Sequence, residues 1–132
     1  MKFKGDKSGS ANYGTPFWRD STPRAWLQGT FYTSAFTAEE KGKIAQLVLD
    51  DVKQDTYNFT DTVFLLSKTE FESYHPSSLG KNWWLRSLAK SGNTFNVYYI
   101  ADATNNTAYM GIDTSASNLY YIRPALWLKY GD

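Results

Sequence analysis

Side chains that commonly carry out chemistry are scarce in this chain of 132 residues. The chain has no cysteine, which excludes thiolate nucleophiles, cysteine-ligated metals and disulfides. Its single histidine, His75, precedes Pro76 and has neither a second histidine for a zinc site nor a G-x-S-x-G element for a serine hydrolase. The acidic residues are concentrated in the expected helical part, where caps and solvated faces explain them. We therefore expect a protein that is not an enzyme and uses no cofactor or metal.

The segment from residue 91 to residue 121 has instead the composition of a binding surface. It contains no Lys, Arg, Glu, His or Pro, and Asn, Tyr, Ala, Thr and Ser dominate it. Tyrosine supplies a large rigid contact area, while Asn, Ser and Thr supply adaptable hydrogen bonds. The alternative is a solvated antiparallel sheet with polar turns. Our candidate ligand-binding residues are Asn96, Tyr98, Tyr99, Asn105, Asn106, Tyr109, Asn118 and Tyr120.

Two apolar blocks flank this segment, and each contains one arginine, Arg86 or Arg123. An unpaired buried charge is very costly, so we interpret both arginines as structural residues bonded to a carboxylate or to backbone carbonyls. The candidate carboxylate partners are Asp61, Glu70 and Glu72. Aromatic side chains supply much of the burial in a small domain, so four tryptophans are also assigned to the core. They are Trp26, Trp83, Trp84 and Trp127.

The overall composition sets further limits. The formal net charge of +1, with Lys and Arg matched by Asp and Glu, gives no electrostatic reason to expect nucleic acid as a partner. No apolar run approaches the roughly 20 residues of a membrane span, so we expect no membrane insertion. The length suits one domain with one core. We predict a flexible arm or linker over the Gly-, Ser- and Lys-rich residues 1–15 and a single domain over residues 16–132.

Helix signals lie in the first part of the chain. Ser21 or Thr22 can cap a short helix over residues 23–28, which Gly29 would end. A capping box at residues 37–40 predicts a second, amphipathic helix over residues 38–49.

Strand signals dominate the rest of the chain. A buried strand is expected at residues 61–66, followed by a capping box at residues 67–70 and one turn of helix ending near Tyr74. Short aromatic or β-branched runs then predict an antiparallel meander. Its expected strands are residues 83–87, 94–101, 107–112, 118–123 and 125–129. The predicted fold class is therefore α+β, with two N-terminal helices and a C-terminal meander.

Five blocks occur in the order and spacing of one bacterial and phage domain family. They are Trp18 with S-T-P-R-A-W-L at 21–27, Phe36 with the box at 37–40, V-F-L-L-S with Glu70 at 63–70, W-W-L-R-S at 83–87, and I-R-P-A-L at 122–126. The chain resembles this uncharacterised family over about residues 17–128. Members usually begin with two further strands before Trp18, where this chain has residues 1–15. Tyr121 stands where members often have a small residue.

The resemblance implies a C-type-lectin-like fold, similar to the variable ligand-binding proteins of diversity-generating retroelements. It is also related in outline to the formylglycine-generating enzymes, but that chemistry depends on cysteine or copper–thiol groups, which this chain lacks. Diversified positions in the variable proteins derive from adenine-rich codons, mostly for Asn, and their products are rich in Tyr, Ser, Thr and Ala. Residues 93–121 are rich in the same residue types. We predict a ligand-recognition domain of this type, located outside the cell or on a phage particle if it belongs to an exported protein.

Two alternatives stay open. The first is a carbohydrate-binding, lectin-like module, although the E-P-N, Q-P-D and W-N-D motifs of calcium-dependent lectins are missing. Four side chains could in principle gather around one ion, namely Asp102, Asn105, Asn106 and Asp113. Turn formation explains their presence more simply. A sugar stacked on Tyr without metal is a further option. The second alternative is a structural or assembly domain of a phage tail or surface protein, with self-association through its Tyr-rich face.

Overall fold

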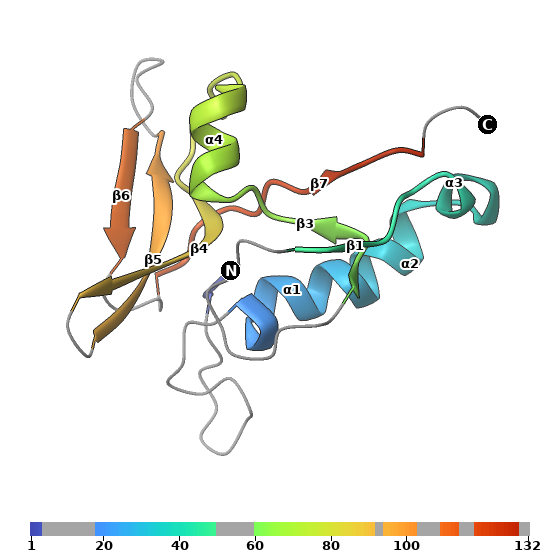
Figure 1. Ribbon diagram of the computed structural model, residues 1–132, viewed down its shortest axis with the longest axis horizontal. Coiled ribbons are helices and arrows are strands. Elements are labelled where there is room, and N and C mark those ends of the chain that lie inside the picture. The colour runs from blue at the N-terminus through green and yellow to red at the C-terminus, as the bar shows by residue number, and fades with distance from the viewer. Residues whose placement is uncertain (4–17, 50–59, 92–93, 103–108, 114–117, 130–132) are drawn as a thin grey trace.

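The computed structural model describes residues 1–3, 18–49, 60–91, 94–102, 109–113 and 118–129 (Figure 1). The described part is an α+β structure in which short helices accompany three small antiparallel sheets. The sheets pair β1 (Leu47–Val48) with β2 (Thr60–Asp61), β3 (Val63–Phe64) with β7 (Ala125–Leu126), and β4 (Trp83–Ser91) with β5 (Thr94–Ala101) and β6 (Tyr109–Asp113) in that order. Figure 1 shows the three-stranded sheet beside α4 (Lys68–Tyr74), and the helical segment that starts at α1 (Thr22–Trp26) on the other side of the β3–β7 pair.

The first helical segment is longer than its sequence predicts. After the short 3₁₀ turn η1 (Trp18–Asp20), α1 (Thr22–Trp26), the π-helical turn η2 (Leu27–Phe31) and α2 (Tyr32–Ala35) follow one another without a break. The expected cap is present, since the Ser21 hydroxyl accepts a hydrogen bond from the N–H of Arg24 at 3.1 Å. The predicted end at Gly29 is wrong. A Cβ added at Gly29 would have no neighbouring atom within 4 Å, and the helical turns continue past this residue.

A glutamine fixes this helical segment to the next strands. Gln28 donates from its amide nitrogen to the carbonyl of Val63. Its amide oxygen accepts from both the N–H of Thr62, at 3.0 Å, and the Thr62 hydroxyl, at 2.9 Å. One side chain therefore satisfies three polar groups at the point where the helix meets β2 (Thr60–Asp61) and β3 (Val63–Phe64).

The second predicted helix begins where expected but ends early. The capping box of Thr37 and Glu40 is complete, and α3 covers Ala38–Gly42. The prediction of helix over residues 38–49 is wrong beyond Gly42, because the following backbone pairs with distant strands. Residues 44 and 45 lie against the C-terminal segment, where the N–H of Ala45 donates to the carbonyl of Trp127 at 2.8 Å. Strand β1 (Leu47–Val48) then pairs with β2. Long-range pairing overrides the local helical pattern here.

The second capping box forms as predicted and is followed by a helix. Ser67 accepts from the N–H of Glu70 at 3.1 Å, Glu70 accepts from the N–H of Ser67 at 2.9 Å, and α4 runs over Lys68–Tyr74. His75 ends the helix in the left-handed conformation, with φ of 45°. The expected strand at residues 61–66 is divided between β2 and β3, and β3 pairs with β7 (Ala125–Leu126).

The meander is confirmed for its first three strands. These are β4 (Trp83–Ser91), β5 (Thr94–Ala101) and β6 (Tyr109–Asp113). The fourth and fifth predicted strands, residues 118–123 and 125–129, are wrong as members of the meander, because β7 within the fifth pairs with β3 in a separate sheet. Residues 118–123 are placed differently again. This segment returns to the other edge of β4, where Tyr121 forms a single parallel bridge with Trp83. The N–H of Tyr121 donates to the carbonyl of Asn82 at 2.8 Å, and the N–H of Trp84 donates to the carbonyl of Tyr121 at 3.2 Å.

Both faces of the β4–β5 pair are covered. On one face Trp84 and Val97 belong to the larger hydrophobic cluster, which also contains Trp18 and Phe64. On the opposite face a smaller cluster packs beneath α4, and its buried members are Trp83, Leu85 and Ile100. This part of the sheet, around residues 83–85 and 97–100, is therefore packed on both faces.

The larger cluster also includes the start of the chain. Phe3 is fully buried and packs edge-on against Trp84, with ring centroids 5.4 Å apart. The predicted flexible arm over residues 1–15 therefore does not extend to residues 1–3, while residues 4–15 lie outside the described part of the chain.

Candidate functional site

The candidate residues on β5 point to two different faces. Successive side chains of a strand alternate between faces. Tyr98 packs with the cluster under α4, whereas Tyr99 packs with the larger cluster around Trp84. Asn96 shares the face of Tyr98 and is only 7% exposed. These three residues therefore cannot contact one ligand on one face of the sheet.

Tyr99 and Tyr120 form an aromatic stack on Trp84. The rings of Tyr99 and Tyr120 are stacked with centroids 4.7 Å apart, and the Tyr120 and Trp84 centroids are 4.6 Å apart. A glycine makes room for Tyr99, because a Cβ at Gly111 would lie 2.7 Å from its ring. The stack holds residues 118–122 against the sheet, so both tyrosines act as support.

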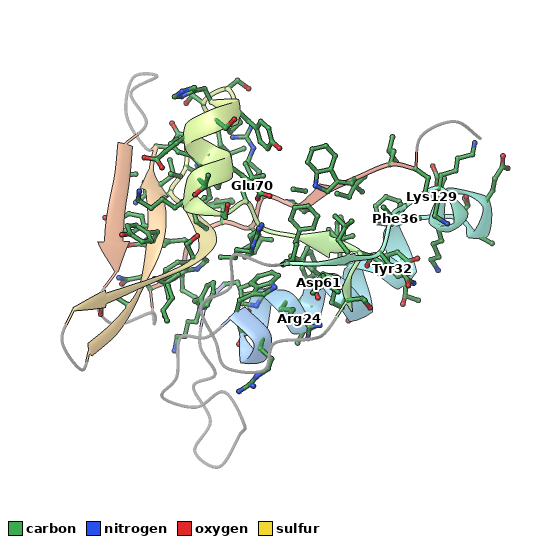
Figure 2. The ribbon with its side chains drawn as sticks, viewed as in Figure 1. Arg24, Tyr32, Phe36, Asp61, Glu70 and Lys129 are labelled. Carbon is green, nitrogen blue, oxygen red and sulfur yellow. The ribbon has the colours of Figure 1, made fainter. Side chains whose placement is uncertain are left out.

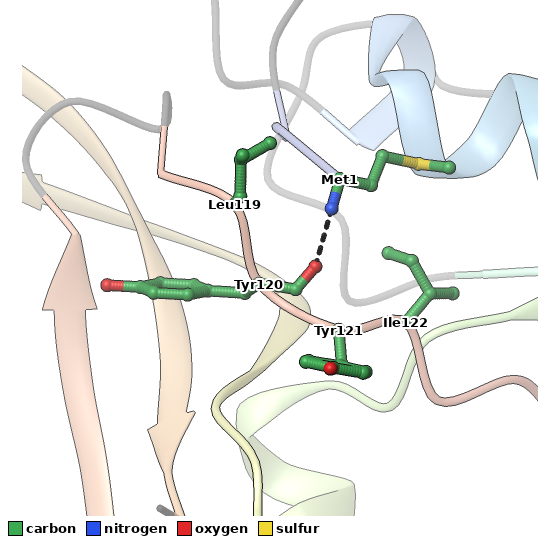
Figure 3. A pocket seen from close by; sticks show the side chains of 5 residues that line it. All are labelled: Met1, Leu119, Tyr120, Tyr121 and Ile122. Atoms are coloured by element: carbon green, nitrogen blue, oxygen red, sulfur yellow. Dashed lines mark hydrogen bonds between the residues drawn. The ribbon is translucent and has the colours of Figure 1, made fainter.

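Beside this stack lies a shallow hollow with a volume of about 270 Å³, called here the 119–122 hollow (Figure 3). Its lining residues are Met1, Leu119, Tyr120, Tyr121 and Ile122. Leu119 is 74% exposed and Tyr121 is 55% exposed. The Met1 amino group donates to the carbonyl of Tyr120 at 2.7 Å, which fixes one wall of the hollow (Figure 3). The hollow is slightly smaller than the roughly 300 Å³ at which small-molecule pockets begin, so it suits one side chain of a partner.

Asn118 lies at the edge of the same segment and is exposed. Its amide nitrogen is 3.4 Å from the Tyr120 hydroxyl, a weak hydrogen bond. Three of the remaining candidates are not placed at side-chain level. Asn105 and Asn106 lie outside the described residues, and only the backbone of Tyr109 is described, as the first residue of β6.

Arg86 is buried and makes the bonds expected of a structural arginine. It donates from Nη1 to the carbonyl of Leu65 at 2.6 Å and to Oε1 of Glu70 at 2.7 Å. The guanidinium also lies 5.4 Å from the ring centroid of Phe64. Of the three carboxylates named from the sequence, Glu70 is the partner of Arg86. Asp61 pairs instead with Arg24, at 2.8 Å (Figure 2).

Arg123 is bonded to backbone and to an aromatic ring. Its Nη1 donates to the carbonyl of Ser77 at 2.7 Å, and its guanidinium lies 5.0 Å from the ring centroid of Trp83. The segment that it contacts is fixed by Asp102, whose carboxylate accepts from the Ser78 hydroxyl at 2.7 Å and from the N–H of Leu79 at 2.6 Å.

Asp102 has a structural role. The indole N–H of Trp83 also donates to it, at 3.3 Å. Burial raises the pKa of Asp102, but the hydrogen bonds from Ser78, Leu79 and Trp83 outweigh burial and hold it below its ordinary value of 3.8. Both carboxylate oxygens thus accept bonds from protein groups. Nowhere among the described residues do three carboxylate or histidine side chains gather to hold a metal ion.

Trp127 is not in the core, contrary to the prediction. It is 46% exposed and lies edge-to-face with Tyr74, which is 53% exposed, with ring centroids 6.2 Å apart. After β7 the backbone leaves β3 and pairs with residues 43–45, and both Trp127 and Leu128 are exposed there. Trp127 and Tyr74 border a second hollow between α4 and β7, of about 170 Å³. Sequence analysis missed this site, although Trp127 and its neighbour Leu128 cannot both be buried in a strand with one covered face.

Residues 2–82 match the model of the DUF6273 family, described as a domain of unknown function. The match covers more than half of the chain. The chain belongs to the DUF6273 family. The matched part of the DUF6273 domain ends one residue before Trp83, so it includes the Arg24–Asp61 pair and α4 but neither β4 nor the 119–122 segment. No curated protein and no solved structure matches the chain. Within the described residues, no helix is long and apolar enough to cross a membrane.

Proposed function

We propose that this DUF6273 protein is a non-enzymatic ligand-recognition domain of C-type-lectin-like type, whose binding face lies within residues 93–121 and continues into the 119–122 hollow. One observation carries the proposal. Leu119 and Tyr121 are largely exposed, yet the backbone between them is fixed by the Tyr120 stack and by two hydrogen bonds to the start of β4. Exposed apolar side chains on a rigid backbone bind a partner with little loss of conformational entropy.

Within the proposed site, support and contact are divided between different residues. Trp84, Tyr99 and Tyr120 form the support. Leu119 and Tyr121, with the exposed Asn118, form the described part of the contact face. Trp84 is fully buried and the two tyrosines are partly buried, so substitutions there are expected to cost stability, whereas exposed positions tolerate most substitutions. This division is what a variable binding protein requires.

Asn96 adds a second argument. Its amide oxygen is buried and has no hydrogen-bond partner among the residues that the structure describes. Leaving a buried acceptor unsatisfied costs about 1–3 kcal/mol, so retention of an amide here calls for a reason. Departures from the usual rules of packing and hydrogen bonding are most often found at functional sites. Asn96 shares the face of Tyr98, opposite the Trp84 cluster, so we propose that it contacts a ligand separately from the 119–122 hollow.

The retroelement origin is tested at the DNA level. The DNA beside the gene is expected to carry a near-copy of the coding sequence for residues 93–121 together with a reverse transcriptase gene. Mismatches between the two copies should be confined to adenines of the template. Mismatches spread over all four bases, or the absence of both elements, would refute this origin and leave a binding domain with a fixed face.

The division between support and face is tested with two matched libraries displayed on yeast. One randomises Asn118, Leu119 and Tyr121, and the other randomises Tyr99 and Tyr120. Lysozyme serves as the protein probe. The first library is expected to keep most members folded and to yield lysozyme binders, whereas most members of the second are expected to unfold. Equal loss of folding in both libraries, or no binder from the first, would contradict the proposal.

A second function is favoured by the exposed apolar residues themselves. Leu119 and Tyr121 would suit a permanent contact with a neighbouring subunit in an assembly. Sedimentation velocity separates the two functions. A concentration-dependent dimer that Leu119→Asp makes monomeric would identify the hollow as an assembly interface, and a monomer at all concentrations supports recognition of a different partner.

A further inference from the structure

The second hollow lies between α4 and β7 and is called here the α4–β7 groove. It has a volume of about 170 Å³. Its floor is apolar and its rim carries the two half-exposed rings of Tyr74 and Trp127. The residues that line it are Phe64, Leu66, Glu70, Tyr74, Ala125, Leu126 and Trp127. None of them lines the 119–122 hollow.

Glu70 supplies the groove with one fixed hydrogen-bond acceptor. Its Oε1 accepts from the N–H of Ser67 at 2.9 Å and from Arg86 at 2.7 Å, so the side chain is held in one position. Its other oxygen, Oε2, makes no hydrogen bond to any described residue. An apolar, aromatic lining with one preorganised polar group is the usual construction of a small-ligand site.

The charges around the groove determine which charge and hydrogen-bonding groups a ligand must have. Glu70 offers only acceptor oxygens, so the ligand must donate a hydrogen. The buried guanidinium of Arg86 already neutralises the carboxylate, which weakens its attraction for a cation. Among the described lining residues there is no Lys or Arg that would hold an anion. A neutral ligand with hydroxyl donors therefore fits best.

The two aromatic rings determine which ligand shape fits the α4–β7 groove. Tyr74 and Trp127 are inclined at 73°, and each is about half exposed, so together they present an apolar corner. A pyranose ring has an apolar C–H face for such a surface and hydroxyl groups around its edge. The volume admits one such ring and is well below the 300–1,000 Å³ of sites for larger ligands.

We propose that the α4–β7 groove binds one neutral sugar residue of a glycan, with its apolar face on Trp127 and Tyr74 and a hydroxyl donated to Oε2 of Glu70. Binding requires no metal. The site is separate from the 119–122 hollow and does not depend on the function proposed there.

The probes are methyl glycosides of glucose, galactose, mannose and N-acetylglucosamine, tested by saturation-transfer NMR on the full chain, with chitin and cellulose pull-down. At least one probe is expected to bind, and Trp127→Ala and Tyr74→Ala are each expected to weaken it at least tenfold, equivalent to about 1.4 kcal/mol. The matched control is Tyr121→Ala, which removes a similarly exposed ring from the other hollow and should leave sugar binding unchanged. A chelator should also have no effect.

Four outcomes would overturn the proposal. They are no binding of any probe, equal loss in Tyr121→Ala, loss of binding on chelation, and tighter binding of tetramethylammonium than of every sugar. The last would identify a cation site. Circular dichroism of each variant shows that the fold is intact, and both substituted rings are exposed enough for their removal to be tolerated.

Discussion

The pair between Asp61 and Arg24 is expected to be the most sensitive polar contact of the described structure. Asp61 is fully buried. Its Oδ1 accepts from Nη2 and Nε of Arg24, at 2.8 and 3.0 Å, and its Oδ2 accepts from the indole N–H of Trp18 at 2.7 Å. The substitution Asp61→Asn keeps the shape but removes the charge and turns an amide N–H₂ toward one of these donors. Breaking a buried pair on one side costs about 3–5 kcal/mol.

That loss is large against the whole stability of a domain, about 5–15 kcal/mol. Urea unfolding followed by tryptophan fluorescence measures it, with the free energy of unfolding extrapolated linearly to water. The matched control is Glu72→Gln, which breaks the exposed Lys68–Glu72 pair of 3.2 Å. An exposed pair is worth about 0–1 kcal/mol, so the control should barely change the free energy of unfolding.

A third variant distinguishes the loss of attraction between Arg24 and Asp61 from the cost of leaving one charge unpaired. Arg24→Met combined with Asp61→Leu removes both charges, and replacing a buried pair by apolar side chains is often neutral. It should recover most of the loss, apart from about 1 kcal/mol for the unsatisfied N–H of Trp18. The reasoning fails if Asp61→Asn costs no more than Glu72→Gln, or if the double variant is less stable than Asp61→Asn.

Two further predictions concern glycine positions and the buried Asp102. Gly111→Ala is expected to destabilise the protein by about 1–3 kcal/mol because its Cβ would lie 2.7 Å from the Tyr99 ring. Gly29→Ala, in open space within the helical segment, should stabilise it by about 0.5–1 kcal/mol, and equal effects in thermal unfolding would contradict the argument. Because hydrogen bonds hold the pKa of Asp102 below 3.8, its contribution is present above that pH and is lost as the pH falls through the folded-state pKa. The difference in free energy of unfolding between wild type and Asp102→Asn should therefore be constant above about pH 5 and shrink in acid, and a constant difference at pH 2–3 would disprove it.

The sequence predicts local features of this fold well and long-range features poorly. The capping boxes at Thr37 and Ser67 depend on residues three apart, so they could be identified without the structure. The helix expected after Thr37 ends early because Ala45 and β1 pair with segments far away in the sequence. No local pattern contains that information. The same limit applies to residues 118–123, whose neighbour is an edge of β4 and not the preceding strand.

The candidate site shows a different limit. Composition indicated the segment of the proposed site but not the orientation of each side chain. Alternation along β5 separates Tyr98 from Tyr99, and this could have been predicted once the strand was assigned. The exposure of Leu119, Tyr121 and Trp127 could not, because it depends on which strand edge each backbone segment joins.

Glu70 contributes both to the stability of the fold and to the proposed sugar site. The same carboxylate caps α4, neutralises Arg86 and lines the α4–β7 groove. Replacing Glu70 would remove all three interactions at once, so a loss of binding in a Glu70 variant would not identify its cause. Trp127 and Tyr74 contribute to the groove without supporting the core, and they alone can separate recognition from stability. Four of the groove residues, Phe64, Leu66, Glu70 and Tyr74, lie in the part that matches the DUF6273 family, whereas Trp127 lies beyond it. Sugar binding that fails in Trp127→Ala would therefore show that the site needs the C-terminal segment as well as the family-matched part.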